Sequence, residues 1–141
     1  MENPPLFLVD ERIKTFRNWP FNDKVKCNVR NMAEAGFYSI ATGTEDADSA
    51  KCFLCGKELD GWEASDDPWT EHVKHAAKCA FVQLGKKEND LFLTEYLSVI
   101  KQYMVNNINN LAEKMVDKID AKAKEKKREI SLHQKRKNDL E

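Results

Sequence analysis

Four residues have the types and the spacing of a metal site: Cys52, Cys55, His72 and Cys79. They form the pattern C-x2-C-x16-H-x6-C, whose first two cysteines can hold one ion between both thiolates. Three thiolates and one imidazole are a ligand set that a tetrahedral structural zinc site uses. The alternative, a buried cysteine pair with unrelated histidines, does not account for the matched downstream ligands. The pattern therefore predicts one structural Zn²⁺ ion.

A second histidine competes for the same role. His72 lies seven residues before Cys79, and His75 lies four residues before it. On one continuous helix both spacings place the histidine on the same face as Cys79. Spacing alone therefore leaves both histidines open as ligands.

The same four ligands argue against catalysis. A site with all four positions filled by protein has no open position for an activated water. The sequence shows no Ser-His-Asp set, Gly-rich phosphate loop or HExxH motif. A zinc-dependent ubiquitin ligase would need a second cysteine-rich module, and only Cys27 remains, which is most simply a small core or surface residue. We therefore expect no enzyme.

Length and composition limit the remaining classes of protein. The chain has 141 residues and a formal net charge of -1, which fits one domain with an extension and gives no bulk attraction for nucleic acid. No apolar run approaches the roughly 18 residues of a membrane span. The stretch 1–10 lacks the basic and apolar regions of a signal peptide. We expect a reducing compartment, in which thiols stay free for metal.

Charge is unevenly distributed along the chain. The segment 57–71 has six acids and one base, and the segment 122–137 has eight bases and two acids. Either segment is also compatible with a simple solvated face. The sequence thus predicts an acidic patch beside the metal site and a basic tail.

The patterning predicts a small mixed domain. A helix is expected over 10–19, ending at Pro20, and a second helix is expected between a cap at Asn28 and Gly36. Three short strands are expected, followed by a helix that starts at Asp67-Pro68 and carries both histidines. The strands are expected at 37–40, at a segment ending with 52–53, and near 58–62.

A long apolar stripe follows from about Asp90, in a stretch without Pro or Gly after Gly85. It repeats every eleven residues, which keeps it on one side of a nearly straight helix. A small domain cannot cover such a stripe, so it predicts partner helices; packing back on the domain, or fraying, is the alternative. The residues expected at the partner interface are Leu97, Ile100, Met104, Ile108, Leu111 and Met115.

Residues 12–81 resemble a baculovirus inhibitor-of-apoptosis repeat, the BIR domain. The matching segments are Arg12 with Thr15-Phe16 and Trp19-Pro20, Met32 to Tyr38, Cys52-Phe53-x-Cys55, Gly61-Trp62, Asp66 to Trp69, Glu71-His72 and Cys79. The resemblance implies an α+β fold, in which short helices surround a three-stranded antiparallel sheet. It assigns the metal to His72 and leaves His75 free. It also implies two parts, a BIR domain over 10–88 and a long helix with a basic tail over 89–141.

The resemblance further implies a groove for peptides with a free amino-terminal Ala. Acids beside a tryptophan suit an ammonium group and a small side chain. The groove residues carried over are Leu59, Asp60, Trp62, Asp66 and Glu71, with Lys57 and His75 reading a nearby phosphate. Ser65 stands where relatives commonly have an acid, which weakens the patch by one charge. The alternatives are a core role for Trp62 and a solvated helix position for His75.

Family members with one BIR domain and a long helix suggest a role in cell division. The resemblance implies a chromosomal passenger complex subunit that binds a phosphorylated histone tail and the helices of borealin and the inner centromere protein. An Aurora-type kinase would thereby reach centromeres and kinetochores, and later the spindle midzone, from nucleus and cytoplasm. A homodimer contact through Leu6, Phe7, Leu93 and Leu97 would compete with the helical partners. The alternative is an inhibitor of apoptosis that acts on caspases or on their amino-terminal-Ala antagonists.

Overall fold

The computed structural model describes residues 5–138. The outermost parts of the amino-terminal stretch and of the basic tail, 1–4 and 139–141, lie outside the described residues. The chain divides into two compact units, residues 1–103 and 104–141. Among the described residues, the first unit contains the sheet and the short helices, and the second contains the part of one long helix from residue 104 to residue 138.

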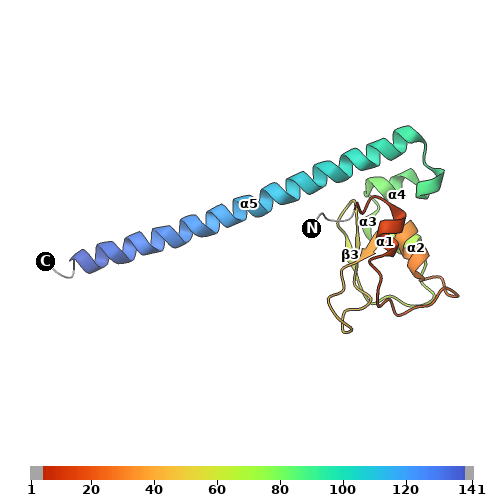
Figure 1. The fold of residues 1–141 in the computed structure, drawn as a ribbon, viewed down its shortest axis with the longest axis horizontal. Coiled ribbons are helices and arrows are strands. Elements are labelled where there is room, and N and C mark those ends of the chain that lie inside the picture. The colour runs from red at the N-terminus through yellow and green to blue at the C-terminus, as the bar shows by residue number, and fades with distance from the viewer. Residues whose placement is uncertain (1–4, 139–141) are drawn as a thin grey trace. The chain divides into compact units, whose positions relative to one another are not determined.

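The first unit is built from short elements around a small sheet (Figure 1). The elements are α1 (Val9–Ile13), α2 (Val29–Glu34), β1 (Phe37–Ser39), β2 (Ala50–Cys52), β3 (Glu58–Leu59), α3 (Pro68–Ala76), α4 (Ala80–Leu84), the 3-10 helix η1 (Glu88–Asp90) and the start of α5 (Leu93–Asn138). This composition confirms the predicted α+β class with a long carboxyl-terminal helix.

The sheet is antiparallel, in the order β1-β2-β3. Phe37 pairs with Cys52, and Ala50 pairs with Leu59. Strand β3 is two residues long and forms an edge, so its outer side has no strand partner in the described part of the chain. The third strand expected near 58–62 is real but ends at Leu59.

Two helix starts follow the predicted cap chemistry. The side chain of Asn28 accepts a hydrogen bond from the Asn31 amide at 2.9 Å before α2. The side chain of Asp67 accepts one from the Thr70 amide at 2.8 Å, with Pro in the first turn of α3. After α2 the backbone turns through Gly36 at φ +93°, a region that favours glycine. These contacts explain why both helices begin where the sequence indicates and why α2 ends before Gly36.

Helix α1 is shorter than the helix predicted over 10–19. The Thr15 hydroxyl donates to the Arg12 carbonyl at 2.6 Å and accepts from the Ser39 amide at 2.8 Å. This side chain therefore joins the end of α1 to strand β1, and the helix stops at Ile13. Trp19 still packs inward, and its ring Nε1 donates to the Cys27 carbonyl at 2.8 Å.

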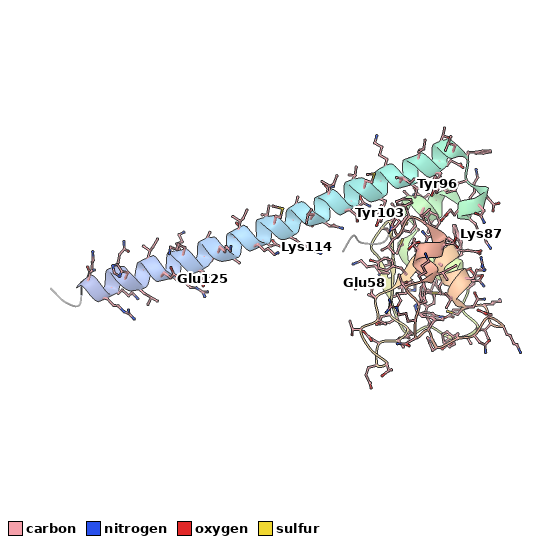
Figure 2. All side chains as sticks on the ribbon, in the orientation of Figure 1. Glu58, Lys87, Tyr96, Tyr103, Lys114 and Glu125 are labelled. Carbon is pink, nitrogen blue, oxygen red and sulfur yellow. The ribbon has the colours of Figure 1, made fainter. Side chains whose placement is uncertain are left out.

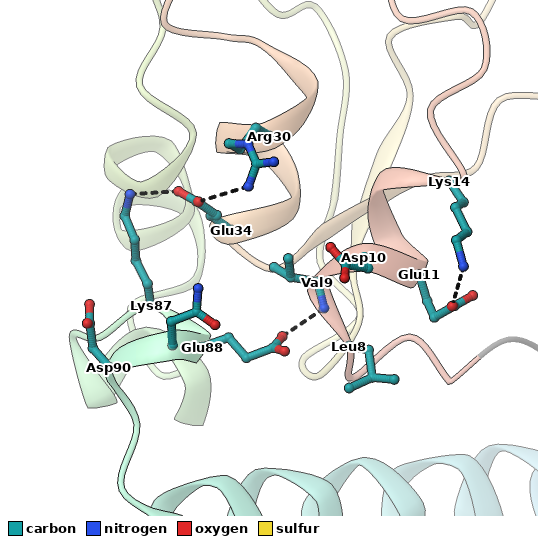
Figure 3. A pocket seen from close by; sticks show the side chains of 11 residues that line it. Leu8, Val9, Asp10, Glu11, Lys14, Arg30, Glu34, Lys87, Glu88 and Asp90 are labelled. Atoms are coloured by element: carbon teal, nitrogen blue, oxygen red, sulfur yellow. Dashed lines mark hydrogen bonds and ion pairs between the residues drawn. The ribbon is translucent and has the colours of Figure 1, made fainter.

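Helix α1 takes its amino-terminal cap from a distant part of the chain. Leu8 at the cap position has no capping side chain, and a Glu88 carboxylate oxygen accepts from the Val9 amide at 2.7 Å (Figure 3). Glu88 also lies 3.6 Å from the guanidinium of Arg12, which is fully buried. Arg12 donates to the carbonyls of Ala33 and Leu6 and lies over the Phe53 ring at 4.5 Å. One buried cation thus ties the amino-terminal segment to the core.

The core of the first unit includes the first turns of α5. Val99 is 6% exposed within the core, and Tyr103 packs at its edge against the rings of Phe7 and Phe53. The compact unit therefore runs past the predicted division at 88/89, because these two helix residues help to cover the sheet domain. The two-part division over 10–88 and 89–141 stays a prediction.

Beyond Tyr103, α5 exposes its side chains, as Lys114 and Glu125 do in Figure 2. The large apolar side chains from Met104 to Ile119 are each between 41% and 65% exposed. No helix within residues 5–138 combines the length and apolar character needed to cross a bilayer.

Candidate metal centre and peptide groove

The fold brings the four predicted metal ligands together. Cys52 ends β2, Cys55 lies in the following turn, His72 projects from α3, and Cys79 precedes α4. One ligand atom from each lies within 4.8 Å of the others. Bonds of about 2.3 Å to sulfur give a tetrahedral edge of about 3.8 Å, so only a slight contraction would enclose a zinc ion.

Neighbouring backbone groups orient the ligands. The carbonyl of Ala35 accepts a hydrogen bond from His72 Nδ1 at 2.7 Å, because a carbonyl can only accept. This leaves His72 Nε2 for metal, and it lies 3.6 Å from the Cys55 sulfur. The amides of Leu54 and Cys55 point at the Cys52 sulfur at 3.4 and 3.5 Å. The surroundings therefore suit a histidine that binds through Nε2 and a thiolate that accepts backbone hydrogen bonds.

The crowding of the cysteines shifts the pKa values of Cys52 and Cys79 in opposite directions. The Cys52 and Cys55 thiols hydrogen-bond the Cys79 sulfur and hold the pKa of that thiol far below its usual range. Contacts with Cys55 and Cys79 raise the pKa of Cys52 well above its usual value. A zinc ion would bind all three sulfurs as thiolates, which requires release of the remaining thiol protons. Cys52, His72 and Cys79 are buried, so the cluster is positioned for one structural zinc ion.

His75 lies outside this cluster. Its side chain is 41% exposed and its Nε2 lies 3.3 Å from the Glu71 carboxylate. The sequence argument that both histidines share a helix face with Cys79 is wrong in its premise, because α3 ends at Ala76. Cys79 instead reaches the cluster from the turn between α3 and α4.

The residues expected in the groove lie in or next to strand β3, in the segment after it and on α3. Leu59 is part of the strand and half-buried, while Lys57 and Asp60 on either side of the strand are exposed. Trp62 is only 7% exposed and lies edge-on to Phe37, with ring centroids 5.3 Å apart. Its burial is that of a core tryptophan, and its ring offers little surface to a peptide in this conformation.

The acids assigned to the groove differ in the hydrogen bonds and ion pairs that they make. Asp66 accepts a hydrogen bond from the Glu63 amide at 2.8 Å. Glu71 contacts Lys74 at 3.1 Å and His75 at 3.3 Å. Asp60 is exposed. Of the groove acids, Glu71 alone is paired with a residue assigned to phosphate reading, His75.

The residues assigned to helical contacts fall into two groups. Ile100 is partly buried, whereas the other five of that set are more than half exposed. Leu93 and Leu97 from the expected homodimer contact are exposed at 72% and 55%. Leu6 and Phe7 instead pack partly against the core of their own chain.

Sequence reasoning missed residues that join separate segments. Asp48 accepts hydrogen bonds from the amides of Gly61 and Trp62, and Glu88 caps α1. Neither acid has a signature in sequence, because each acts across a long separation in the chain. The core role of Val99 and Tyr103 could have been predicted from sequence, because both are apolar residues of the long helix that lie outside the eleven-residue stripe.

Comparison with known proteins agrees with this geometry. The family model for the inhibitor-of-apoptosis domain, BIR, matches residues 12–83. Baculoviral IAP repeat-containing protein 5 of Cavia porcellus is 41% identical over 85% of this chain and 86% of its own length. The protein of the same name from Rattus norvegicus is 45% identical over 74% of this chain and 75% of its own.

Similar proteins also occur among amphibians and among solved structures. Baculoviral IAP repeat-containing protein 5.2-B of Xenopus laevis is 39% identical over 85% of this chain and 76% of its own length. The crystal structure of an autoinhibited dIAP1-BIR1 domain is 35% identical, with a TM-score of 0.47, over 55% of this chain and 73% of that one. The family match covers about half of the chain, and the curated relatives match 74% to 85% of it. The chain belongs to the baculoviral inhibitor-of-apoptosis repeat family, as a survivin-like protein with a single BIR domain.

Proposed function

We propose that the chain is a non-catalytic subunit of the chromosomal passenger complex. Its zinc-folded domain reads a histone amino-terminal tail that bears a phosphothreonine. Its long helix docks on borealin-like and inner-centromere-protein-like helices. Together these contacts direct an Aurora-type kinase to centromeres in mitosis and to the spindle midzone in cytokinesis.

The observation that carries this proposal is the exposed apolar stripe of α5. Met104, Ile108, Leu111 and Met115 are 57%, 65%, 61% and 57% exposed. Covering each side chain would contribute roughly 1.5–3 kcal/mol before the entropy of association. An exposed apolar stripe of this length favours association of the helix with other helices. A helical bundle would bury the stripe along its whole length.

The peptide side of the proposal rests on the edge of the sheet. Within residues 5–138 no strand pairs with the outer side of β3, so an extended peptide can add there as a further strand. Main-chain hydrogen bonds would hold the peptide, and the exposed acid Asp60 lies at the end of this strand. The carboxylates of Asp66 and Glu71 would add negative charge around the peptide ammonium group.

The phosphate would meet two further side chains, Lys57 just before β3 and His75 on α3. Lys57 precedes β3 and is exposed, and His75 projects from α3 with its ring against Glu71. A ring N–H of His75 would donate to the phosphate while Glu71 holds the ring in place. Glu71 would then act on the peptide ammonium and on the phosphate reader at once.

Calorimetry tests the reader half of the proposal. A histone tail peptide with a free Ala terminus is titrated into the zinc-loaded chain, with and without phosphate on its threonine. We expect the phosphorylated peptide to bind at least about ten-fold more tightly, as one or two charge-assisted hydrogen bonds would give. Equal affinity for both peptides would remove the reader function.

An inhibitor of apoptosis is the second candidate. The same strand edge and acids would receive any peptide with a free amino-terminal Ala, which caspase antagonists also present. This function needs no phosphate and no helical partner. A phosphate-independent affinity, with α5 left unpartnered in cells, would favour it.

The expected homodimer is also a proposal. Leu93 and Leu97 are exposed on α5 and available for a second copy, while Leu6 and Phe7 are already partly covered. Because Leu97 also belongs to the proposed helical interface, the homodimer and the passenger assembly would exclude each other.

A further inference from the structure

The segment that follows strand β3 has no regular secondary structure. Residues 60–66 contain Asp60, Trp62 and Asp66, three of the residues assigned to the groove. No ladder of backbone hydrogen bonds fixes this segment, because β3 ends at Leu59. The placement of these side chains must therefore come from other contacts.

One of these contacts is a carboxylate from the loop between β1 and β2. Oδ2 of Asp48 accepts a hydrogen bond from the Gly61 amide at 2.9 Å and from the Trp62 amide at 3.3 Å. Gly61 has φ +69°, a conformation that favours glycine. Asp48 thus binds two successive amides at the point where the chain turns away from β3.

The loop itself holds Asp48 in place. The carboxylate of Asp46 accepts hydrogen bonds from the Thr42 and Gly43 amides at 2.8 Å. The Ser49 amide donates to the Asp46 carbonyl at 2.9 Å, and Ile40 closes the loop on Ser49 at 3.0 Å. These hydrogen bonds fix the conformation of the loop that carries Asp48.

Two other contacts hold the far end of the segment. The Cys27 amide donates to the Ala64 carbonyl at 3.3 Å, and Asp66 accepts from the Glu63 amide at 2.8 Å. The segment is therefore held to other parts of the fold at two places, by Asp48 at Gly61 and Trp62 and by Cys27 at Ala64.

We propose that Asp48 is a positioning residue for the peptide groove. By holding the Gly61 and Trp62 amides, it sets where the chain leaves the β3 edge, and hence where the exposed Asp60 meets a peptide. Asp48 does not contact the peptide in this proposal. The inference rests on the proposed peptide-reading function and names a residue that this function requires.

The test compares two substitutions at one position. Asp48→Ala removes the acceptor, whereas Asp48→Asn keeps an amide oxygen that can accept both hydrogen bonds and removes only the charge. Glu45→Ala, an exposed acid of the same loop, controls for the loss of one negative charge nearby. Each variant is titrated with the free-Ala phosphothreonine peptide, and zinc content is measured in parallel.

We expect Asp48→Ala to weaken peptide binding about ten-fold with one zinc ion retained. Asp48→Asn and Glu45→Ala are expected to stay within about three-fold of the native chain. In the native chain and the Asn variant the Gly61 amide should exchange slowly with solvent, and in the Ala variant quickly.

Three outcomes would overturn the inference. Equal losses in the Ala and Asn variants would assign Asp48 a direct charge effect on the ammonium. An unchanged affinity for Asp48→Ala would show that the segment is held without it. A native chain that binds no peptide at all would refute the proposed function as well, which distinguishes that failure from failure of the positioning role alone.

Discussion

At the scale of single residues, the metal ligands and the second histidine have separate tasks. His72 is buried against the Ala35 carbonyl with one nitrogen directed at Cys55, and His75 is exposed beside Glu71. Their positions in sequence differ by three residues, less than one turn of helix. The difference in environment, rather than in residue type, makes one a ligand and the other a candidate phosphate reader.

Substitution of the ligands tests the metal assignment. Cys52→Ala and His72→Ala should lose zinc and unfold the small domain, because metal binding supplies much of the folding free energy of such domains. His75→Ala, three residues from His72, is the matched control and should retain one zinc ion. Elemental analysis of the purified variants measures this. Zinc that persists in His72→Ala and disappears from His75→Ala would reverse the assignment.

The two proposed phosphate readers have their own prediction. Lys57→Ala and His75→Ala should each lower the preference for the phosphorylated peptide by about ten-fold, since each removes a charge-assisted hydrogen bond. Binding of the plain peptide should change little. Exposed Lys74, which also contacts Glu71, is the control position. Variants that lose both peptides equally would point to a general loss of the groove.

At the scale of elements, local chemistry predicts the capped helices well. The side chains of Asn28 and Asp67 each accept a hydrogen bond from the backbone amide three residues later in the chain. Both helices start where the sequence indicates. The prediction fails for α1, because Thr15 bonds to β1 and Glu88 caps the helix from η1. Contacts between distant segments are set by the folded chain and leave no periodic trace in the sequence.

The cap of α3 gives a prediction with a pH dependence. Asp67→Ala should lower the free energy of unfolding by about 1 kcal/mol at neutral pH, because it leaves a helix amide without an acceptor. The Thr70 amide lowers the pKa of Asp67 in the folded chain. A depressed pKa stabilises the fold above the unfolded pKa, and this stability is lost as pH falls through the folded value.

The difference in unfolding free energy between native chain and Asp67→Ala should therefore be constant near neutral pH and shrink below about pH 4. Urea unfolding of both zinc-loaded proteins across this range measures it. A difference that grew on acidification would contradict the assignment of Asp67 as an ionised cap.

Charged substitutions within the apolar stripe of α5 test whether it binds partner helices. Ile108→Glu with Leu111→Glu should abolish co-elution with borealin and inner-centromere-protein fragments, because two buried charges would remain unpaired in the bundle. Asn107→Glu with Asn110→Glu has the same spacing on neighbouring exposed positions and should leave assembly intact. Zinc content and peptide affinity should be unchanged in both. Size-exclusion chromatography after co-expression decides, and a stripe variant that still co-elutes would contradict the docking face.

At the scale of the whole molecule, two activities are assigned to separate stretches of chain. The groove depends on β3, the following segment and α3, while the exposed stripe begins near Leu97 and continues to Ile119. The ligand spacing and the stripe could be predicted from sequence, because each is a regular pattern. The roles of Asp48, Glu88 and Arg12 could not, because each depends on which distant backbone groups the fold brings within hydrogen-bond distance.

The central claim is that this chain serves as a mitotic scaffold and reader, and affinity purification from mitotic cells tests it most directly. The native chain and the Ile108→Glu, Leu111→Glu variant are purified in parallel, and the bound proteins are identified by mass spectrometry. We expect the native chain to recover borealin-like and inner-centromere-protein-like subunits with an Aurora-type kinase, and the variant to lose all three. Recovery of caspases or their antagonists by both proteins, without passenger subunits, would contradict the account and establish the inhibitor function instead.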